Sequence, residues 1–193
     1  MVYGAACTGS RVMSSSSSPG ISLMMEGLSY IAGTEIPAVL IDVMRGGPGL
    51  GNIAPAQADY NQIVKGGGHG DFNMLVLAPA SVQESIDLTV EAFDLAEKYR
   101  VITVILVDGN IGQMMEPAEL PPMKPVKTVY PDWAVRGAAG RDSRFLTSIW
   151  IDPPKEEVVN LRIQRRWQQV KANEVRYKTY FMDDARYVVV GFR

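Results

Sequence analysis

Cysteine is almost absent from this sequence of 193 residues, in which Cys7 is the only one. A single cysteine excludes a disulfide framework, a Cys-x-x-Cys motif and a complete set of iron–sulfur ligands on this chain. We expect Cys7 to be a buried structural thiol. If the protein takes part in electron transfer, the clusters must lie on another chain.

An excess of charge is also missing. Nineteen Lys and Arg against 21 Asp and Glu give a formal net charge of −2, and no basic block occurs. Nucleic acid and anionic membrane surfaces are therefore poor candidates as principal partners. No apolar run approaches the roughly 20 residues that span a bilayer, and the first residues lack the layout of a signal peptide. We expect a cytoplasmic protein.

Hydrophobic residues make up 47% of the chain, which is enough for a full core. Three short apolar runs do not alternate with polar residues, as is typical of strands covered on both faces: 38–43, 74–78 and 101–107. Ser81 and Glu84 form a capping box that predicts a helix reaching Tyr99. The strand–helix alternation from residue 10 to about 109 predicts an α/β fold with a parallel sheet flanked by helices.

The pattern changes in the second half of the chain. Five prolines within residues 116–131 indicate an extended or irregular connection. A charged, helix-prone run follows from Lys155 to about Tyr180, in which we expect Arg165 and Arg166 on a solvated face. Four apolar residues at helical spacing predict a packing face on this helix: Val159, Ile163, Trp167 and Val170.

The last apolar run, residues 187–192, predicts a buried strand. We therefore divide the chain into three parts. These are an α/β domain at 1–115, a proline-rich linker at 116–153, and a helix with the first strand of a truncated second domain at 154–193.

Two loops rich in glycine, serine and proline carry the functional signal. The second runs from Arg45 through residues 46–52, and each loop follows a predicted strand. Open α/β sheets bind ligands at the carboxyl ends of their strands. Neither loop matches the P-loop or the dinucleotide Gly-x-Gly-x-x-Gly pattern, and structural turns would also explain them. The first loop ends in a serine run followed by proline and glycine: Ser16, Ser17, Ser18, Pro19 and Gly20.

Further blocks of sequence follow the same order as in a known family. Together they resemble the α subunit of the 2-oxoacid:ferredoxin oxidoreductases, in the group that acts on 2-oxoglutarate or branched-chain oxoacids. The resemblance covers residues 9 to about 117, and the tail to residue 193 has far weaker motifs. The blocks that carry it are 15–23, 26–30, 43–49, 55–59, 68–71, 81–84, 92–100 and 108–109.

The resemblance implies a thiamine diphosphate-binding fold of which this chain provides the pyrimidine-binding domain. It implies that a β subunit holds the diphosphate and its Mg²⁺, and that iron–sulfur clusters lie on partner chains that reduce ferredoxin. The implied reaction is oxidative decarboxylation of a 2-oxoacid to an acyl-coenzyme A. No metal ligand is expected on this chain, which we expect to form an oligomer. Which 2-oxoacid is used is left open.

Residue roles follow from the same resemblance. Ser16, Ser17, Ser18, Pro19 and Gly20 would lie beside the pyrimidine ring, and Ser18 is also predicted to cap the helix that begins at Pro19. Arg45 matches the arginine that faces the substrate carboxylate, where a guanidinium can make two parallel charge-assisted bonds. A helix cap and an ordinary interface arginine remain the structural alternatives.

His69 is the only histidine, and Gly68 and Gly70 beside it predict a tightly turned or mobile loop. It would contact the substrate or shuttle a proton, or act as a hydrogen-bonded turn residue. Gln57, Asp59 and Asp71 are motif positions to which the resemblance assigns no role.

The resemblance also has a gap. Family α subunits carry a Tyr-Pro-Ile-Thr-Pro segment and a glutamate that activates the pyrimidine ring, and both would lie upstream of Met1. We therefore expect the fold to be incomplete at its amino terminus and this polypeptide alone to be inactive. Two alternatives stay open: a non-catalytic scaffold or degenerate paralogue that assembles with a β subunit, and an unrelated nucleotide-binding α/β module.

Overall fold

The computed structural model describes residues 1–125 and 128–191. Its centre is a four-stranded parallel sheet with the strand order β1-β2-β4-β3. The expected α/β class, a parallel sheet flanked by helices, is confirmed. The strands are β1 (Met13–Ser16), β2 (Ala38–Met44), β3 (Leu75–Leu77) and β4 (Ile102–Asp108).

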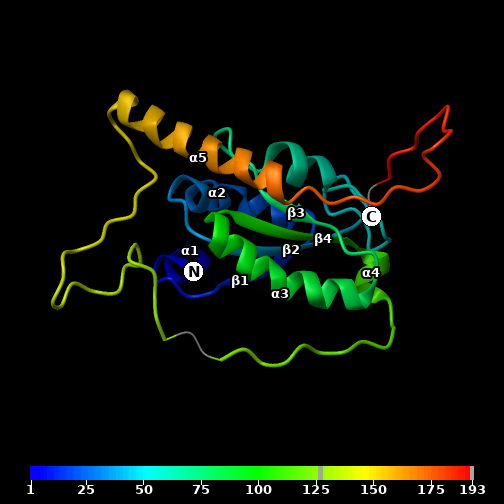
Figure 1. Cartoon of the computed structure of the whole chain (residues 1–193), viewed down its shortest axis with the longest axis horizontal. Coiled ribbons are helices and arrows are strands. Elements are labelled where there is room, and N and C mark those ends of the chain that lie inside the picture. Colours follow the sequence, from blue (N-terminus) through cyan, green and yellow to red (C-terminus); the bar gives the residue numbers. More distant parts are fainter. Residues whose placement is uncertain (126–127, 192–193) are drawn as a thin grey trace.

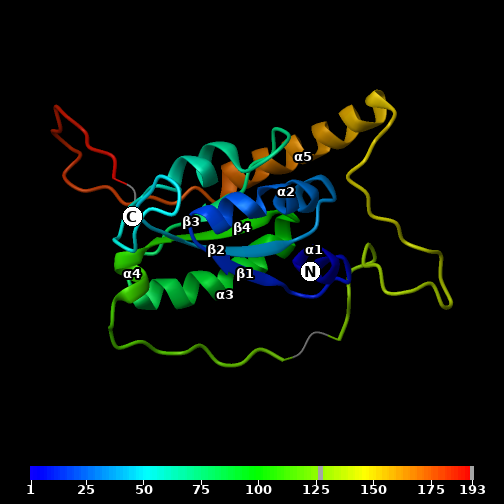
Figure 2. The same cartoon turned by 180° about the vertical axis from the view of Figure 1, so that it is seen from behind.

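Helices cover both faces of this sheet (Figures 1 and 2). On one face, α1 (Val2–Cys7) and α2 (Pro19–Gly33) pack against Leu40 of β2. On the other face, α3 (Val82–Tyr99) packs against Val39 of the same strand. Successive side chains of a strand point to opposite faces, so β2 and β4 need apolar residues on both sides, which explains their continuous hydrophobic runs.

The expected helix between the second and third strands is nearly absent. The structure forms only the five-residue π-helical turn η1 (Gln62–Gly66) there. Gly67 and Gly68 follow it with positive φ angles of 88° and 127°. These backbone conformations suit glycine and end a helix, so the glycine run replaces a full helix with a tight loop.

The capping box at the start of α3 is confirmed with one difference. Ser81 Oγ accepts a hydrogen bond from the Glu84 N–H at 3.1 Å. The Glu84 carboxylate reaches one residue further back than expected and accepts from the Ala80 N–H at 2.8 Å. Both bonds satisfy backbone groups that the helix itself cannot pair.

No helix or strand forms between α4 (Gly109–Gln113) and α5 (Pro153–Asn173) in the described residues, and this segment runs around the outside of the α/β body (Figure 1). The predicted strand at 187–192 is wrong for residues 187–191. These residues form no strand, and Tyr187 and Val189 are more than 90% exposed. A strand needs a neighbour to pair its backbone groups, and none of the described strands lies beside this segment. Residue 192 lies outside the described residues.

Helix α5 uses the predicted packing face. Val159 and Val170 are buried, and Trp167 packs in the core beside α3. The helix ends at Asn173 rather than near Tyr180. No helix in the part of the chain that the structure describes has the length and apolar content needed to cross a membrane.

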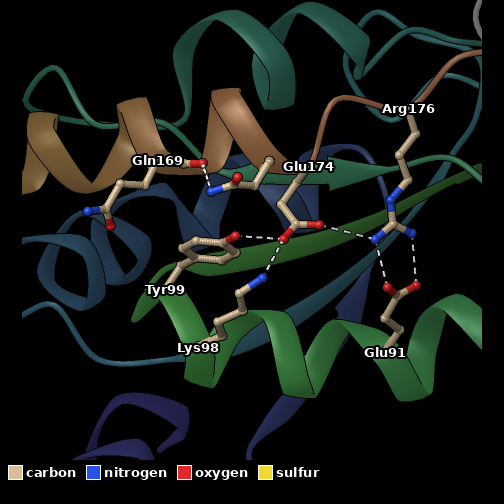
Figure 3. Close-up of polar contacts among 7 residues, drawn as sticks. Glu91, Lys98, Tyr99, Gln169, Glu174 and Arg176 are labelled. Carbon is tan, nitrogen blue, oxygen red and sulfur yellow. Dashed lines mark hydrogen bonds and ion pairs between the residues drawn. The ribbon is translucent and has the colours of Figure 1, made fainter.

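Ionic contacts explain where α5 ends. Glu174 accepts hydrogen bonds from Lys98 Nζ at 2.8 Å and from the Tyr99 hydroxyl at 2.6 Å. Arg176 then pairs with both oxygens of Glu91, at 2.8 and 2.6 Å. Figure 3 shows these contacts joining the chain beyond α5 to α3. Because the helix ends at this point, the two charged side chains Glu174 and Arg176 lie where residues of α3 can pair with them.

A second ionic cluster joins α5 to the turn between α2 and β2. The Glu35 carboxylate is 6% exposed and pairs with Arg162 and with Arg166 Nη1, the latter at 2.6 Å. Arg100 Nε donates to the Glu35 carbonyl at 2.8 Å. The expectation of a solvated Arg166 is therefore wrong, whereas Arg165 is exposed. Burial opposes ionisation of Glu35, but the two guanidinium groups outweigh it and lower the pKa of that carboxyl.

This cluster predicts a stability that is lost in acid. A carboxyl whose pKa is lowered by folding contributes stability above its unfolded pKa of about 4.3, and the contribution disappears as pH falls through the folded value. We expect Glu35→Gln to destabilise the protein by about 3 kcal/mol at neutral pH, the lower end for a broken buried pair because Arg162 is half exposed. Urea unfolding at pH 7 and at low pH measures both effects.

Glu157→Gln is the matched control, because Glu157 is an exposed glutamate on α5, the helix that carries Arg162 and Arg166. We expect it to change stability by less than about 0.5 kcal/mol. Equal losses of stability in the two variants would show that the ion pairs of Glu35 contribute no more to stability than an exposed glutamate does.

Candidate functional site

The turn formed by Ser16, Ser17, Ser18, Pro19 and Gly20 joins β1 to α2 at the carboxyl end of the sheet. We call it the 16–20 turn. Its centre is Ser18, which is buried and has a positive φ of 48°. A non-glycine residue in such a conformation costs on the order of 1–3 kcal/mol and persists only where its surroundings enforce it.

Asp59 supplies that enforcement from a distant part of the chain. Its Oδ2 accepts hydrogen bonds from the Ser18 backbone N–H at 3.2 Å and from Ser18 Oγ at 3.1 Å. The predicted capping role of the Ser18 side chain is therefore wrong. Ser18 occupies the N-cap position of α2, but its side chain accepts no capping bond and its hydroxyl is directed at Asp59, to which it donates.

Gly20 lets the turn close tightly. A Cβ atom at this position would lie 2.1 Å from Ser16 Oγ. The side chain of Ser16 therefore occupies the space that any other residue at position 20 would need. Ser16, Ser17, Pro19 and Gly20 are all partly exposed, so the outer side of the turn is open to a ligand.

The 46–52 loop begins at the carboxyl end of β2, next to the 16–20 turn. Its backbone closes through hydrogen bonds from the Gly46 N–H to the Ala54 carbonyl and from the Asn52 N–H to the Gly46 carbonyl. Gly51 has φ 57°, and a Cβ there would lie 1.7 Å from the Gly46 oxygen. Glycine is thus required at position 51 for the loop to adopt this shape.

Arg45 joins the two loops. Its Nε donates to Ser17 Oγ at 3.1 Å, and its Nη1 donates to the carbonyls of Leu50 and Asn52, the latter at 3.0 Å. A guanidinium has five N–H donors, and these three bonds leave two for a ligand. The structure therefore brings two of the predicted site elements together and orients the guanidinium beside the 16–20 turn.

The end of β4 completes the same edge of the sheet. Asp108 Oδ1 accepts from the N–H groups of Asn110 and Ile111 at 2.9 and 3.1 Å, which makes Asp108 the N-cap of α4. The described residues contain no group of three or more His, Cys, Asp or Glu side chains placed to hold a metal ion.

His69 lies in a different place. Its backbone N–H donates to Ser29 Oγ at 2.8 Å, in the middle of α2 rather than at its first turn. Its exposed side chain lines a cavity of about 750 Å³ between α2, the 68–72 loop and α5. Glu26, whose carboxylate accepts from the Tyr30 hydroxyl at 2.7 Å, lines the same cavity. The predicted contact of His69 with substrate stays a prediction. His69 does not lie beside Arg45, because it contacts the middle of α2 and Arg45 contacts the turn before that helix.

Two acidic residues of the site had no predicted role. Asp59 lies in the block 55–59, to which the family resemblance assigns no role. Its contact with Ser18 joins residues far apart in the sequence, so local patterns do not reveal it. Asp42 was counted within an apolar strand, yet it is fully buried near Asp59. An acid inside a strand covered on both faces is itself a signal, because such a group is rarely buried without a reason.

Comparisons with known proteins identify the family of this chain. Residues 1–181 match the family described as pyruvate flavodoxin/ferredoxin oxidoreductase, thiamine diP-bdg. The ketoisovalerate oxidoreductase subunit VorB of Methanothermobacter thermautotrophicus is 53% identical over all of this chain and 54% of its own length. The 2-oxoglutarate synthase subunit KorA of Archaeoglobus fulgidus is 44% identical over 66% of this chain and 37% of its own length.

A solved structure gives the same result. The 2-oxoglutarate:ferredoxin oxidoreductase from Magnetococcus marinus, with 2-oxoglutarate, coenzyme A and succinyl-CoA bound, matches 91% of this chain and 35% of its own, with a TM-score of 0.67 and 25% identity. This chain spans about half the length of the VorB relatives that it matches. From the family match over residues 1–181 and the similarity to VorB, the chain belongs to the thiamine diphosphate-binding family of the 2-oxoacid:ferredoxin oxidoreductases.

Proposed function

We propose that this chain provides the pyrimidine side of a thiamine diphosphate site in a 2-oxoacid:ferredoxin oxidoreductase. The observation that carries the proposal is the bond between Arg45 and Ser17. It brings a guanidinium and a tight serine–glycine turn together at the carboxyl end of a parallel sheet, where α/β folds bind ligands.

The residues present fit the pyrimidine half of the cofactor. The 16–20 turn carries small side chains and is partly exposed, and Gly20 brings the backbone close to its neighbours. A flat aromatic ring can approach such a turn closely and use its backbone groups. When bound, thiamine diphosphate supplies the electron sink for decarboxylation. The turn would hold and orient the ring, which is the protein's contribution to this chemistry.

Arg45 would bind the carboxylate of the 2-oxoacid with its two remaining N–H donors. Its bonds to Ser17, Leu50 and Asn52 fix the plane of the guanidinium before the substrate arrives. Among substrates, a branched-chain oxoacid of the 2-oxoisovalerate type is supported by the 53% identity to VorB, against 44% to KorA.

The remaining parts of the reaction would lie on other chains. We propose a β subunit that holds the diphosphate and its Mg²⁺, and an iron–sulfur subunit that passes electrons to ferredoxin, with coenzyme A as the acyl acceptor. The relatives named above are subunits of multi-subunit oxidoreductases. Within this chain, the proposed division assigns the thiamine role to residues 1–115.

Replacing Gly20 tests the 16–20 turn. Gly20→Ala places a Cβ at 2.1 Å from Ser16 Oγ, so Ser16 must leave its rotamer at a cost of up to about 1.5 kcal/mol. We expect the affinity of the assembled complex for thiamine diphosphate to fall by up to about tenfold. Adding Ser16→Ala removes the collision and should restore part of the affinity.

Gly27→Ala is the matched control on the same helix, because a Cβ at Gly27 meets no atom within 4 Å. It should leave thiamine binding unchanged and stabilise α2 by about 0.5–1 kcal/mol. Binding by the Gly20→Ala complex at the wild-type affinity would contradict a role for the turn.

Replacing Arg45 tests the substrate contact. A charge-assisted hydrogen bond contributes about 1.5–3 kcal/mol, so we expect Arg45→Ala to lower kcat/KM for the oxoacid by roughly 10- to 100-fold. Assembly should be disturbed far less than oxoacid turnover. Steady-state kinetics of the complete complex with an artificial electron acceptor measure the effect.

Arg45→Ala also removes two bonds to the 46–52 loop, and Asn52→Ala controls for this. Asn52→Ala removes the 2.8 Å hydrogen bond that the Ala54 N–H donates to Asn52 Oδ1, and it leaves the Arg45 guanidinium in place. If Asn52→Ala lowers kcat/KM as much as Arg45→Ala, the arginine acts through the loop and not on the substrate.

A further inference from the structure

Asp42 is a buried carboxyl without a partner. Its side chain is 0% exposed, and neither carboxyl oxygen has a hydrogen-bond partner among the residues that the structure describes. It lies on the same face of β2 as Leu40 and Met44, which pack in the core beside α2. A buried polar group of this kind is costly and calls for an explanation.

The position of Asp42 connects it with the 16–20 turn. Asp42 is the register partner of Ser16 on β1 and of Leu106 on β4. Among the described residues, the charged group whose field acts on it is Asp59, the residue that anchors Ser18. Asp42 therefore lies behind the turn, next to the carboxylate that holds it.

The two carboxyls cannot both be ionised without cost. Burial raises the pKa of Asp42 to about 7, and the Asp59 carboxylate adds to this effect. With Asp42 neutral, no like charge faces the Asp59 carboxylate while it accepts both bonds from Ser18. With Asp42 ionised, like charges in a buried site repel each other, and the movable partner is Asp59, which lies on a loop.

We propose that Asp42 is a positioning residue whose proton keeps Asp59 on Ser18 and thereby holds the 16–20 turn in its binding conformation. As pH rises through about 7, Asp42 loses its proton and the turn loosens. Thiamine diphosphate binding then weakens with rising pH in this range. This inference rests on the proposed function of the turn, although the protonation of Asp42 does not.

The first test follows thiamine diphosphate affinity of the assembled complex at pH 6 and pH 8. We expect wild type to bind at least about fivefold more weakly at pH 8, the lower end of typical coupling between two sites. Asp42→Asn keeps a neutral side chain of the same shape, so it should bind equally at both pH values. A wild-type affinity that does not change with pH, or an equal change in Asp42→Asn, would overturn the proposal.

Thr103→Val is the matched control. Thr103 is also 0% exposed and its hydroxyl has no partner among the described residues, but it pairs in register with Val39 and Leu75 on the opposite, α3-facing side of the sheet. This variant removes a buried unpaired polar group without changing a charge. It should keep the wild-type dependence of thiamine binding on pH.

Infrared spectroscopy of the complex without thiamine tests the protonation of Asp42 separately from the proposed thiamine-binding role of the 16–20 turn. We expect a protonated-carboxyl band at pH 6 that decreases by pH 8 and is missing from Asp42→Asn. In Asp59→Asn the band should disappear at lower pH, because the neighbouring charge is gone. If the band is present but thiamine binding does not depend on pH, Asp42 is protonated as inferred, and its proposed link to cofactor binding is refuted. Absence of the band from wild type at pH 6 would overturn the inference, even if Asp42→Asn fails to fold.

Discussion

The candidate site depends on the contact between Asp59 and Ser18. Two hydrogen bonds to one carboxylate oxygen hold Ser18 at a positive φ that its side chain disfavours. This conformation directs the chain from β1 into α2 and places Ser17 where Arg45 can reach it. Because Asp59 follows the 46–52 loop, the same contact brings both loops to one edge of the sheet. Loss of this carboxylate would separate the turn from the arginine that we assign to the substrate.

The rest of the fold supports that edge from behind. The long pairing of β2 with β4 fixes where each strand ends, and therefore where Arg45 and Asp108 emerge. The Glu35 cluster and the contacts of Glu174 and Arg176 attach α5 at two points. Helix α5 lines the cavity at His69, which is separate from the sheet edge at Arg45 that we assign to the proposed chemistry.

Local patterns in the sequence predicted the parallel sheet, α2, α3 and the packing face of α5, because these depend on apolar spacing and caps. The predictions failed where distant residues decide. Ser18 has the sequence context of a helix cap, but in the fold its hydroxyl is directed at Asp59. Arg166 has the context of a surface residue, but in the fold it pairs with the buried carboxylate of Glu35. The run at 187–192 has the composition of a strand, but residues 187–191 pair with no strand in the part of the chain that the structure describes. The proximity of Asp42 to Asp59 likewise depends on the tertiary fold.

The most direct test is hydrogen exchange of the complete complex with and without thiamine diphosphate. The account predicts that the cofactor slows exchange at the amides of residues 16–21 and 45–52, while the 68–72 loop beside His69 changes little. Protection confined to the 68–72 loop and the first half of α5, with the 16–20 turn unchanged, would contradict it and place the cofactor in the cavity at His69.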